Sequence, residues 1–258
     1  MSTTRTMSWP GAVSTPANGP TEPPDIETSS ETYARRFRGP VGAWLLRVQE
    51  QAVLQMLSAM PHSAVLEVGG GHGQLTAALI RQGHRVTVVG SSPSCQERIK
   101  PLLDAGLCRF STVDLLNLPY PDGAFDAVIS VRLLAHLESW RRVIAELARV
   151  AHHGVIVDYP TFRSWNCLTP LLFYVKRWFE KSTRPYRVFH EAAIVEAFAA
   201  HGLAYQHRSP QLFFPIVLHR VLGQADVSAS LEAVCRKVGL TEALGSPVIA
   251  MFTRLETP

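Results

Sequence analysis

The sequence has few cysteines, little charge and no long apolar run, and each shortage excludes a class of protein. Its four cysteines are Cys95, Cys108, Cys167 and Cys235, and no two of them form a CxxC pair, so we expect neither a metal site nor a disulfide framework. Reduced thiols are typical of the cytoplasm, which is the expected location. No stretch reaches the ~18 consecutive apolar residues of a transmembrane helix. The first residues lack a basic start followed by an apolar segment, so no secretory signal is expected.

Charged residues make up only 18% of the 258 residues, and the formal net charge is +4. The basic residues are scattered in pairs such as Arg35-Arg36 and Arg141-Arg142. Proteins that bind nucleic acid usually concentrate their basic residues on one face, so we expect ordinary solvated surface and no nucleic-acid partner. Apolar residues make up 47% of the chain, which is a globular composition.

Composition divides the chain into a tail and one domain. Residues 1–30 are rich in proline, serine, threonine and glycine, with little apolar area to offset the entropy of ordering, and we predict a disordered tail there. Residues 31–258 are expected to form a single domain. Within it, residues 33–62 form a helical cap, because apolar residues recur at helical spacing over residues 41–60.

Strand and helix patterns then alternate through a core at residues 63–160. Strands are predicted at 64–68, 85–89, 110–113, 125–131 and 154–158, and helices at 74–82, 93–104 and 139–150. This alternation indicates an α/β fold with a doubly wound, mostly parallel sheet. After Tyr159 the alternation stops at an aromatic and basic insertion, residues 161–189. A helix at 190–200 and strands at 203–208 and 247–254 complete the sheet, with a second, helical insertion at 212–245 before the last strand.

The stretch VLEVGGGHG, residues 65–73, carries the chemistry. A buried strand runs into Gly69, Gly71 and Gly73, and a helix follows, so the backbone can approach a nucleotide-like ligand closely. A dinucleotide fingerprint needs glycine where Gln74 stands, which argues against a nicotinamide-dependent oxidoreductase. Glu67, two residues before the first glycine, disfavours a diphosphate and suits a cationic ligand; the alternative is an acid that caps neighbouring amides.

Further motifs follow in order along the chain. Asp114 follows the strand FSTV, the turn PDGAFD spans residues 121–126, His136 comes after the next strand, and ELARVAHHGVIVDY completes the series. Over about residues 60–160 the sequence resembles the seven-strand, class I S-adenosylmethionine-dependent methyltransferases, in particular the type 11 branch that acts on small molecules. The resemblance implies a Rossmann-like methyltransferase fold, S-adenosylmethionine as cofactor and methyl transfer as the reaction.

The resemblance also implies roles for individual residues. Glu67 would organise the amino group of the cofactor, and Asp114 would accept a hydrogen bond from the adenine amino group. The remaining cofactor contacts would come from the glycines of the turn, from Leu115 against the adenine ring and from Ser130 near the methyl group, that is from Gly69, Gly71, Gly73, Leu115 and Ser130.

One position departs from the family. The end of the second strand usually carries an acid that holds both ribose hydroxyls, and Gly90 stands there. Losing that acceptor should weaken binding by about 1–3 kcal/mol unless Ser91 or Ser92 takes over. A cofactor-binding regulator or partner subunit without catalysis is therefore the main alternative to an enzyme.

Methyl transfer is an in-line displacement that depends mainly on alignment, and a base is needed only when the acceptor must lose a proton. His136 is the first candidate base because imidazole titrates near neutral pH. A structural histidine at a helix start is the alternative. Tyr159 is a second catalytic candidate and His72 a further one, since ligands of open parallel sheets collect beyond the carboxyl ends of the strands.

The two insertions are rich in aromatic and apolar side chains, which predicts a small hydrophobic or aromatic acceptor, such as a quinone, a polyketide or a lipid. The basic and aromatic run around residues 176–181 leaves peripheral contact with a membrane surface as an alternative. The sequence does not indicate an oligomeric state.

Overall fold

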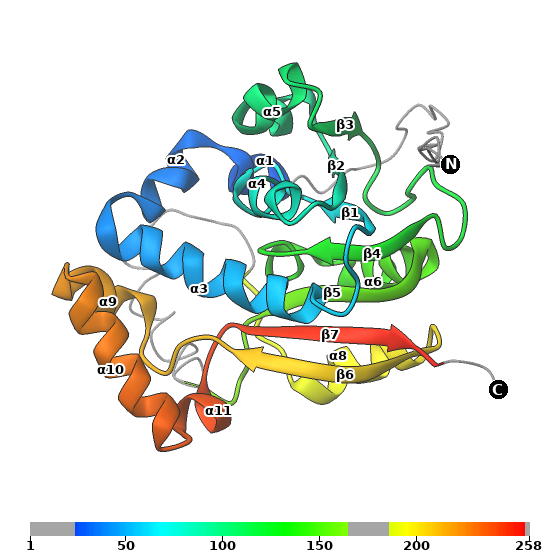
Figure 1. Ribbon diagram of the computed structural model, residues 1–258. Helices are drawn as coiled ribbons and strands as arrows, with labels where there is room; N and C mark the ends of the chain where they lie inside the picture. Colours follow the sequence, from blue (N-terminus) through cyan, green and yellow to red (C-terminus); the bar gives the residue numbers. More distant parts are fainter. Residues whose placement is uncertain (1–23, 165–185, 256–258) are drawn as a thin grey trace, which may run out of the picture.

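A computed structural model describes residues 24–164 and 186–255 of the chain, and its centre is one seven-stranded sheet (Figure 1). The strands are β1 (Ala64–Val68), β2 (Arg85–Gly90), β3 (Cys108–Thr112), β4 (Phe125–Ser130), β5 (Ala151–Tyr159), β6 (Leu203–Pro210) and β7 (Val248–Arg254). Their order is β3-β2-β1-β4-β5-β7-β6. The first five run parallel, and β7 pairs antiparallel with both β5 and β6. The predicted doubly wound, mostly parallel sheet is confirmed.

Helices cover both faces of this sheet. One face carries α3 (Gly39–Leu57) and α4 (Gln74–Arg81), and the other carries α6 (Trp140–Val150) and α8 (Glu191–Ala199) (Figure 1). The first core contains Val53, Leu57 and Leu79 packed on the sheet. The second contains Val143, Leu147 and Phe198. Because successive strand residues point to opposite faces, β1, β2, β4, β5 and β7 contribute to both cores.

The end of β5 shows this division clearly. Ile156 belongs to the core beneath α3, whereas Val157 and Tyr159 belong to the core beneath α6 and α8. Asp158 therefore faces the α3 side, and Tyr159 faces the opposite side.

The predicted tail is wrong for residues 24–30. Pro24–Ser29 form helix α1, and Glu31–Ala34 form α2, which leads into a 3-10 turn, η1 (Arg35–Phe37). Asp25 is fully buried, and Thr28 and Ser29 are 4% exposed. The prediction considered only the apolar area of the segment. Polar contacts between Asp25 and Ser91, at the edge of the sheet, hold this segment in place, and composition does not reveal them.

The remaining predicted helices are observed with small changes. The helix predicted at 93–104 is a 3-10 stretch, η2 (Pro93–Ile99), followed by a short α5 (Lys100–Asp104), because Pro101 has no N–H to continue a helical ladder. A 3-10 turn, η3 (Leu134–His136), follows β4. The second insertion holds α9 (Ile216–Leu222), α10 (Ala225–Lys237) and α11 (Leu240–Leu244).

Residues 165–185, most of the first insertion including the run around 176–181, lie outside the described residues. Across the described ranges, no helix has both the length and the apolar character needed to cross a bilayer.

Candidate cofactor and acceptor site

The glycine turn joins β1 to α4 at the carboxyl edge of the sheet. The Gly69 N–H donates to the Val89 carbonyl oxygen of the neighbouring strand at 2.9 Å. Gly69 (φ 74°) and Gly73 (φ 78°), the N-cap of α4, adopt the left-handed conformation that favours glycine. The two other glycines allow close packing. A Cβ atom at Gly71 would overlap Ser29 Oγ and the Cys95 carbonyl oxygen, and one at Gly70 would overlap the Glu67 carboxyl group.

Glu67 lies directly beneath this turn. Its side chain is nearly inaccessible, and Thr76 Oγ1 donates a hydrogen bond to Glu67 Oε2 at 2.6 Å. Burial raises the pKa of Glu67 to about 7, although the Thr76 hydrogen bond and the charge of Arg132 oppose the shift. Glu67 Oε2 accepts a hydrogen bond from a hydroxyl group, whereas an acid that caps the turn would accept hydrogen bonds from backbone amides. Glu67 is therefore an acid that is only partly ionised near neutral pH and can gain a cationic partner.

A carboxylate from α1 lies at the end of β2, where Gly90 lacks a side chain. The Ser91 N–H donates to Asp25 Oδ2 at 2.6 Å, and Ser91 Oγ donates to Asp25 Oδ1 at 2.6 Å. A Cβ atom at Gly90 would lie 3.3 Å from Asp25 Oδ2 and only 2.7 Å from Cys95 Cβ. Position 90 thus has no room for an acidic side chain of its own, and Asp25 brings a carboxylate to the same place from another element.

The other expected cofactor residues follow the neighbouring strands. Asp114, after β3, is half-buried and accepts a hydrogen bond at Oδ1 from the Leu116 N–H at 2.9 Å. Leu115 is buried and belongs to the core beneath α6 and α8. Ser130 ends β4, fully buried, and its hydroxyl has no hydrogen-bond partner among the described residues. Because β3, β2, β1 and β4 are parallel neighbours, the structure brings these residues to the edge that carries the glycine turn.

A small pocket of about 150 Å³ adjoins this edge. Its walls come from α2, η1, α3, the turn after β4, the end of β5 and the link between β6 and α9. His136 and Tyr186 line it, with their ring centroids 5.7 Å apart, and Asp158 lines it from β5. Asp158 Oδ2 accepts a hydrogen bond from Gln49 Nε2 at 3.4 Å, and burial raises the pKa of Asp158 to about 6. Most of the remaining wall is apolar.

Sequence reasoning missed Arg132, which lines the same pocket. It follows β4 with φ 63°, an uncommon conformation for a non-glycine residue that often marks functional sites. Its N–H donates to Asp158 Oδ1 at 2.6 Å, and its Nη2 donates to Gln74 Oε1 at 3.2 Å. The only signal in the sequence is a basic residue directly after an apolar strand, at the edge where ligands collect.

Two expected catalytic side chains are placed differently from the prediction. Tyr159 is fully buried in the core beneath α6 and α8, next to Phe189, and no residue in the described part of the chain forms a hydrogen bond with its hydroxyl. The alternation of β5 turns Tyr159 away from the pocket, so the prediction of a catalytic Tyr159 is corrected, and Asp158 takes its place there. His72 is packed between Tyr33 and Phe37, and desolvation by burial lowers its pKa to about 3, which leaves a neutral and weakly basic ring.

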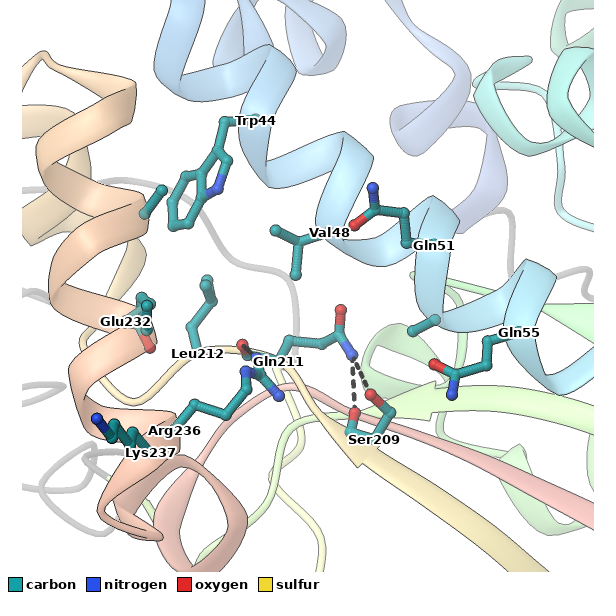
Figure 2. A pocket seen from close by; sticks show the side chains of 13 residues that line it. Trp44, Val48, Gln51, Gln55, Ser209, Gln211, Leu212, Glu232, Arg236 and Lys237 are labelled. Carbon is teal, nitrogen blue, oxygen red and sulfur yellow. Dashed lines mark hydrogen bonds between the residues drawn. The ribbon is translucent and has the colours of Figure 1, made fainter.

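A wider groove of about 530 Å³ lies between α3 and α10 (Figure 2). Trp44, Val48 and Gln51 line it from α3, and Glu232 and Arg236 from α10 (Figure 2). The residues that line both this groove and the small pocket are Val48, Gln211 and Leu212. The groove therefore borders the pocket on the side of the second insertion, away from the glycine turn.

These features define a class of protein. A glycine turn without the dinucleotide spacing sits at the edge of a doubly wound sheet, beside a buried acid and a pocket. This arrangement defines a Rossmann-like, doubly wound protein with a ligand-binding edge at the glycine turn.

The comparisons make the class specific. Residues 66–157 match the family model described as a methyltransferase domain. Residues 66–157 are thus similar to a methyltransferase domain, and they form part of a seven-strand Rossmann-like sheet.

Two relatives in sequence are methyltransferases by name, and a solved structure shares the fold. An O-methyltransferase of Pyrenophora dematioidea is 29% identical over 108 residues, which cover 40% of each chain. A demethylmenaquinone methyltransferase of Tropheryma whipplei is 32% identical over 108 residues, 40% of this chain and 44% of the relative. The chain thus matches less than half the length of either relative. The crystal structure of magnesium protoporphyrin IX methyltransferase from Synechocystis PCC 6803 has a TM-score of 0.63 and 16% identity, with 89% of this chain and 98% of that chain covered.

Proposed function

We propose that the protein is an enzyme that transfers the methyl group of S-adenosylmethionine to a small hydrophobic or aromatic acceptor. The observation that carries the proposal is the pairing of a buried acid beneath a glycine turn with an adjoining, mostly apolar pocket. The turn suits a ligand that needs close backbone approach, and the acid suits a cationic amino group. The pocket suits an acceptor that must exclude water from the methyl group.

In this proposal Glu67 organises the amino group of the cofactor, and Gly69, Gly71 and Gly73 border its methionine and ribose portions. The free N–H groups at the start of α4 add donors at the same place. Asp114 would accept from the adenine amino group, and Ser130 would line the methyl region. The buried, unpartnered hydroxyl of Ser130 supports this role, because such a group is costly unless a ligand completes its hydrogen bonding.

Asp25 is proposed to hold the ribose hydroxyls in place of the missing acid after β2. A carboxylate offers about four acceptor positions, and the Ser91 N–H, Ser91 Oγ and Cys95 Sγ occupy three of them, so one acceptor position remains for a ribose hydroxyl. An acid at the end of the second strand is the usual ribose ligand of doubly wound nucleotide-binding folds. Ser91 then acts by fixing Asp25, a different role from the direct replacement expected of it. A carboxylate at this place supports the catalytic reading over a cofactor-binding protein without catalysis.

His136 is proposed as the base for acceptors that must lose a proton. Its ring lines the small pocket beside Tyr186, on the side of the acceptor. The second insertion would shape the acceptor site, because Leu212 and Ile216 line the pocket and Leu212 continues into the groove of Figure 2. An acceptor larger than about 150 Å³ would extend into that groove.

Calorimetry with S-adenosylhomocysteine tests the cofactor, and turnover with quinols, phenols and fatty acids tests the acceptor. We expect binding, together with methyl transfer to at least one apolar hydroxyl compound. Binding without turnover of any acceptor would favour the regulatory alternative. A folded protein that binds neither S-adenosylmethionine nor S-adenosylhomocysteine would refute the proposal.

A further inference from the structure

We infer that Arg132 binds a carboxylate group of a ligand, at the boundary between the glycine turn and the small pocket. This inference rests on the proposed function for the identity of the ligands, but it rests on the surroundings of Arg132 for its chemistry. No motif of the sequence singles out Arg132.

The backbone of Arg132 is held firmly in place. Its N–H donates to Asp158 Oδ1 at 2.6 Å, so the residue is anchored to the end of β5 in its left-handed conformation. Gln49 from α3 binds the other oxygen of the same carboxylate. These bonds fix where the side chain starts and leave the Asp158 carboxylate occupied by neutral donors.

Among the described residues, the guanidinium group of Arg132 forms no ion pair, and Asp158 and Glu67 attract it only through space. Nη2 donates to the neutral Gln74 amide, and the Cζ atom lies 5.3 Å from the centroid of the Phe37 ring. Nη1 is buried and has no hydrogen-bond partner, and no carboxylate of the described residues forms an ion pair with this side chain within 4.0 Å. A buried cation without a partner is strongly unfavourable, which is why such groups in proteins are paired or bind a ligand.

The free hydrogen-bonding capacity has the shape of a carboxylate site. Nη1 keeps both of its N–H groups and Nη2 keeps one, on the end of a planar fork that matches two carboxylate oxygens. Phe37 covers the guanidinium and restricts its orientation. A neutral acceptor group would accept these hydrogen bonds without opposing the positive charge, so the site favours an anion.

The position of Arg132 admits two sources of that carboxylate. Gln74, which holds Nη2, is the first residue of α4 directly after the glycine turn, so the amino-acid carboxylate of the cofactor is one source. Arg132 also lines the small pocket with His136 and Tyr186, so an acidic group on the acceptor is the other source. Both use the same chemistry and differ in which ligand carries it.

The test compares pairs of ligands that differ only in the part bearing the carboxylate. S-Adenosylhomocysteine is compared with 5′-methylthioadenosine, which lacks the amino-acid portion. Benzoate is compared with benzamide in the presence of saturating 5′-methylthioadenosine. Calorimetry is run on the wild type, Arg132→Gln, Arg132→Lys and a control, Arg81→Gln, whose side chain is 63% exposed and pairs with Glu50 on the surface.

If the cofactor supplies the carboxylate, Arg132→Gln should weaken S-adenosylhomocysteine at least about tenfold and leave 5′-methylthioadenosine unchanged. If the acceptor supplies it, the same variant should abolish the preference for benzoate over benzamide and leave both nucleosides unchanged. Arg132→Lys should restore part of the lost affinity, and Arg81→Gln should behave as the wild type. The melting temperature of Arg132→Gln should not fall, because the substitution removes an unpaired buried cation.

Two results would overturn the inference. One is an Arg132→Gln protein with unchanged affinity for all four ligands. The other is an equal loss for charged and uncharged members of each pair, which would indicate a purely structural residue. A wild type that binds neither nucleoside refutes the proposed cofactor instead, and the benzoate comparison, run without nucleoside, still decides the role of Arg132.

Discussion

The sharpest prediction concerns Glu67, because its protonation couples cofactor binding to pH. Burial raises the pKa of this carboxyl from 4.5 to about 7 in the free protein. A cationic amino group bound next to Glu67 would favour the ionised form and lower that pKa. Binding should therefore strengthen as pH rises, and the protein should release protons when it binds.

The magnitude follows from the two protonation states. If the complex keeps Glu67 ionised throughout, affinity for S-adenosylhomocysteine should rise about tenfold between about pH 6 and about pH 8. Near neutral pH about half a proton should be released per ligand bound. Calorimetry in two buffers with different heats of ionisation measures this release directly.

The same shift predicts a stability effect of the opposite sign. The folded protein holds a proton on Glu67 that the unfolded chain loses above about pH 4.5, so the free energy of unfolding should decrease as pH rises toward about 7. The full difference corresponds to about 3 kcal/mol. Glu67→Gln should show neither dependence and should be more stable than the wild type at about pH 8 in urea titrations.

The control and the refutation are both direct. Thr76 can still donate its hydroxyl hydrogen bond to the amide oxygen of Glu67→Gln, so this variant keeps the local packing. A wild-type affinity that does not change with pH over this range would refute the assigned role of Glu67. A pH dependence that survives in Glu67→Gln would assign the proton to another group.

Four further predictions test the remaining residues. Asp25→Asn should weaken S-adenosylhomocysteine about 10- to 100-fold, because it removes a charged acceptor for the ribose hydroxyls; unchanged calorimetry would contradict this. His136→Asn should lower kcat about 10²- to 10⁴-fold for acceptors that must lose a proton, with cofactor affinity unaltered, and a normal rate would leave His136 a structural role. Tyr159→Phe should keep full activity and raise the free energy of unfolding by about 1 kcal/mol, since it removes a buried hydroxyl without a partner among the described residues. A loss of turnover would instead indicate that Tyr159 takes part in catalysis. Gly71→Val should lower both cofactor affinity and the melting temperature, because the valine side chain would overlap Ser29 and Cys95 even in the free protein. Normal cofactor binding by this variant would show that the cofactor lies elsewhere.

Local patterns were sufficient for the order of elements and for the glycine turn. The expected strand at 64–68 has the observed bounds of β1, and the helix expected at 74–82 differs from α4 by one residue. Strand and helix periodicity depends on neighbouring residues, so it can be read without the fold. The turn is equally local, since its left-handed positions need glycine wherever the chain is placed.

The face to which each side chain of β5 points could not be predicted. Residues 154–159 are nearly all apolar because helices cover both sides of the strand, so no alternation marks an inner and an outer face. Pairing with β4 and β7 sets the register, and only this tertiary contact turns Asp158 to the pocket and Tyr159 to the core.

A doubly wound sheet, a methyltransferase-like glycine turn and an acid at the end of the preceding strand could be predicted from the sequence, because these features depend on residues close together in the chain. Tertiary structure alone decided that Asp25 reaches Ser91 across 66 positions and that the guanidinium of Arg132 meets Gln74 across 58. A polar residue in a proline-rich segment and a lone arginine after a strand carry no local pattern. Their chemistry arises only when folding brings a carboxylate to an empty strand end and encloses a cation without a partner.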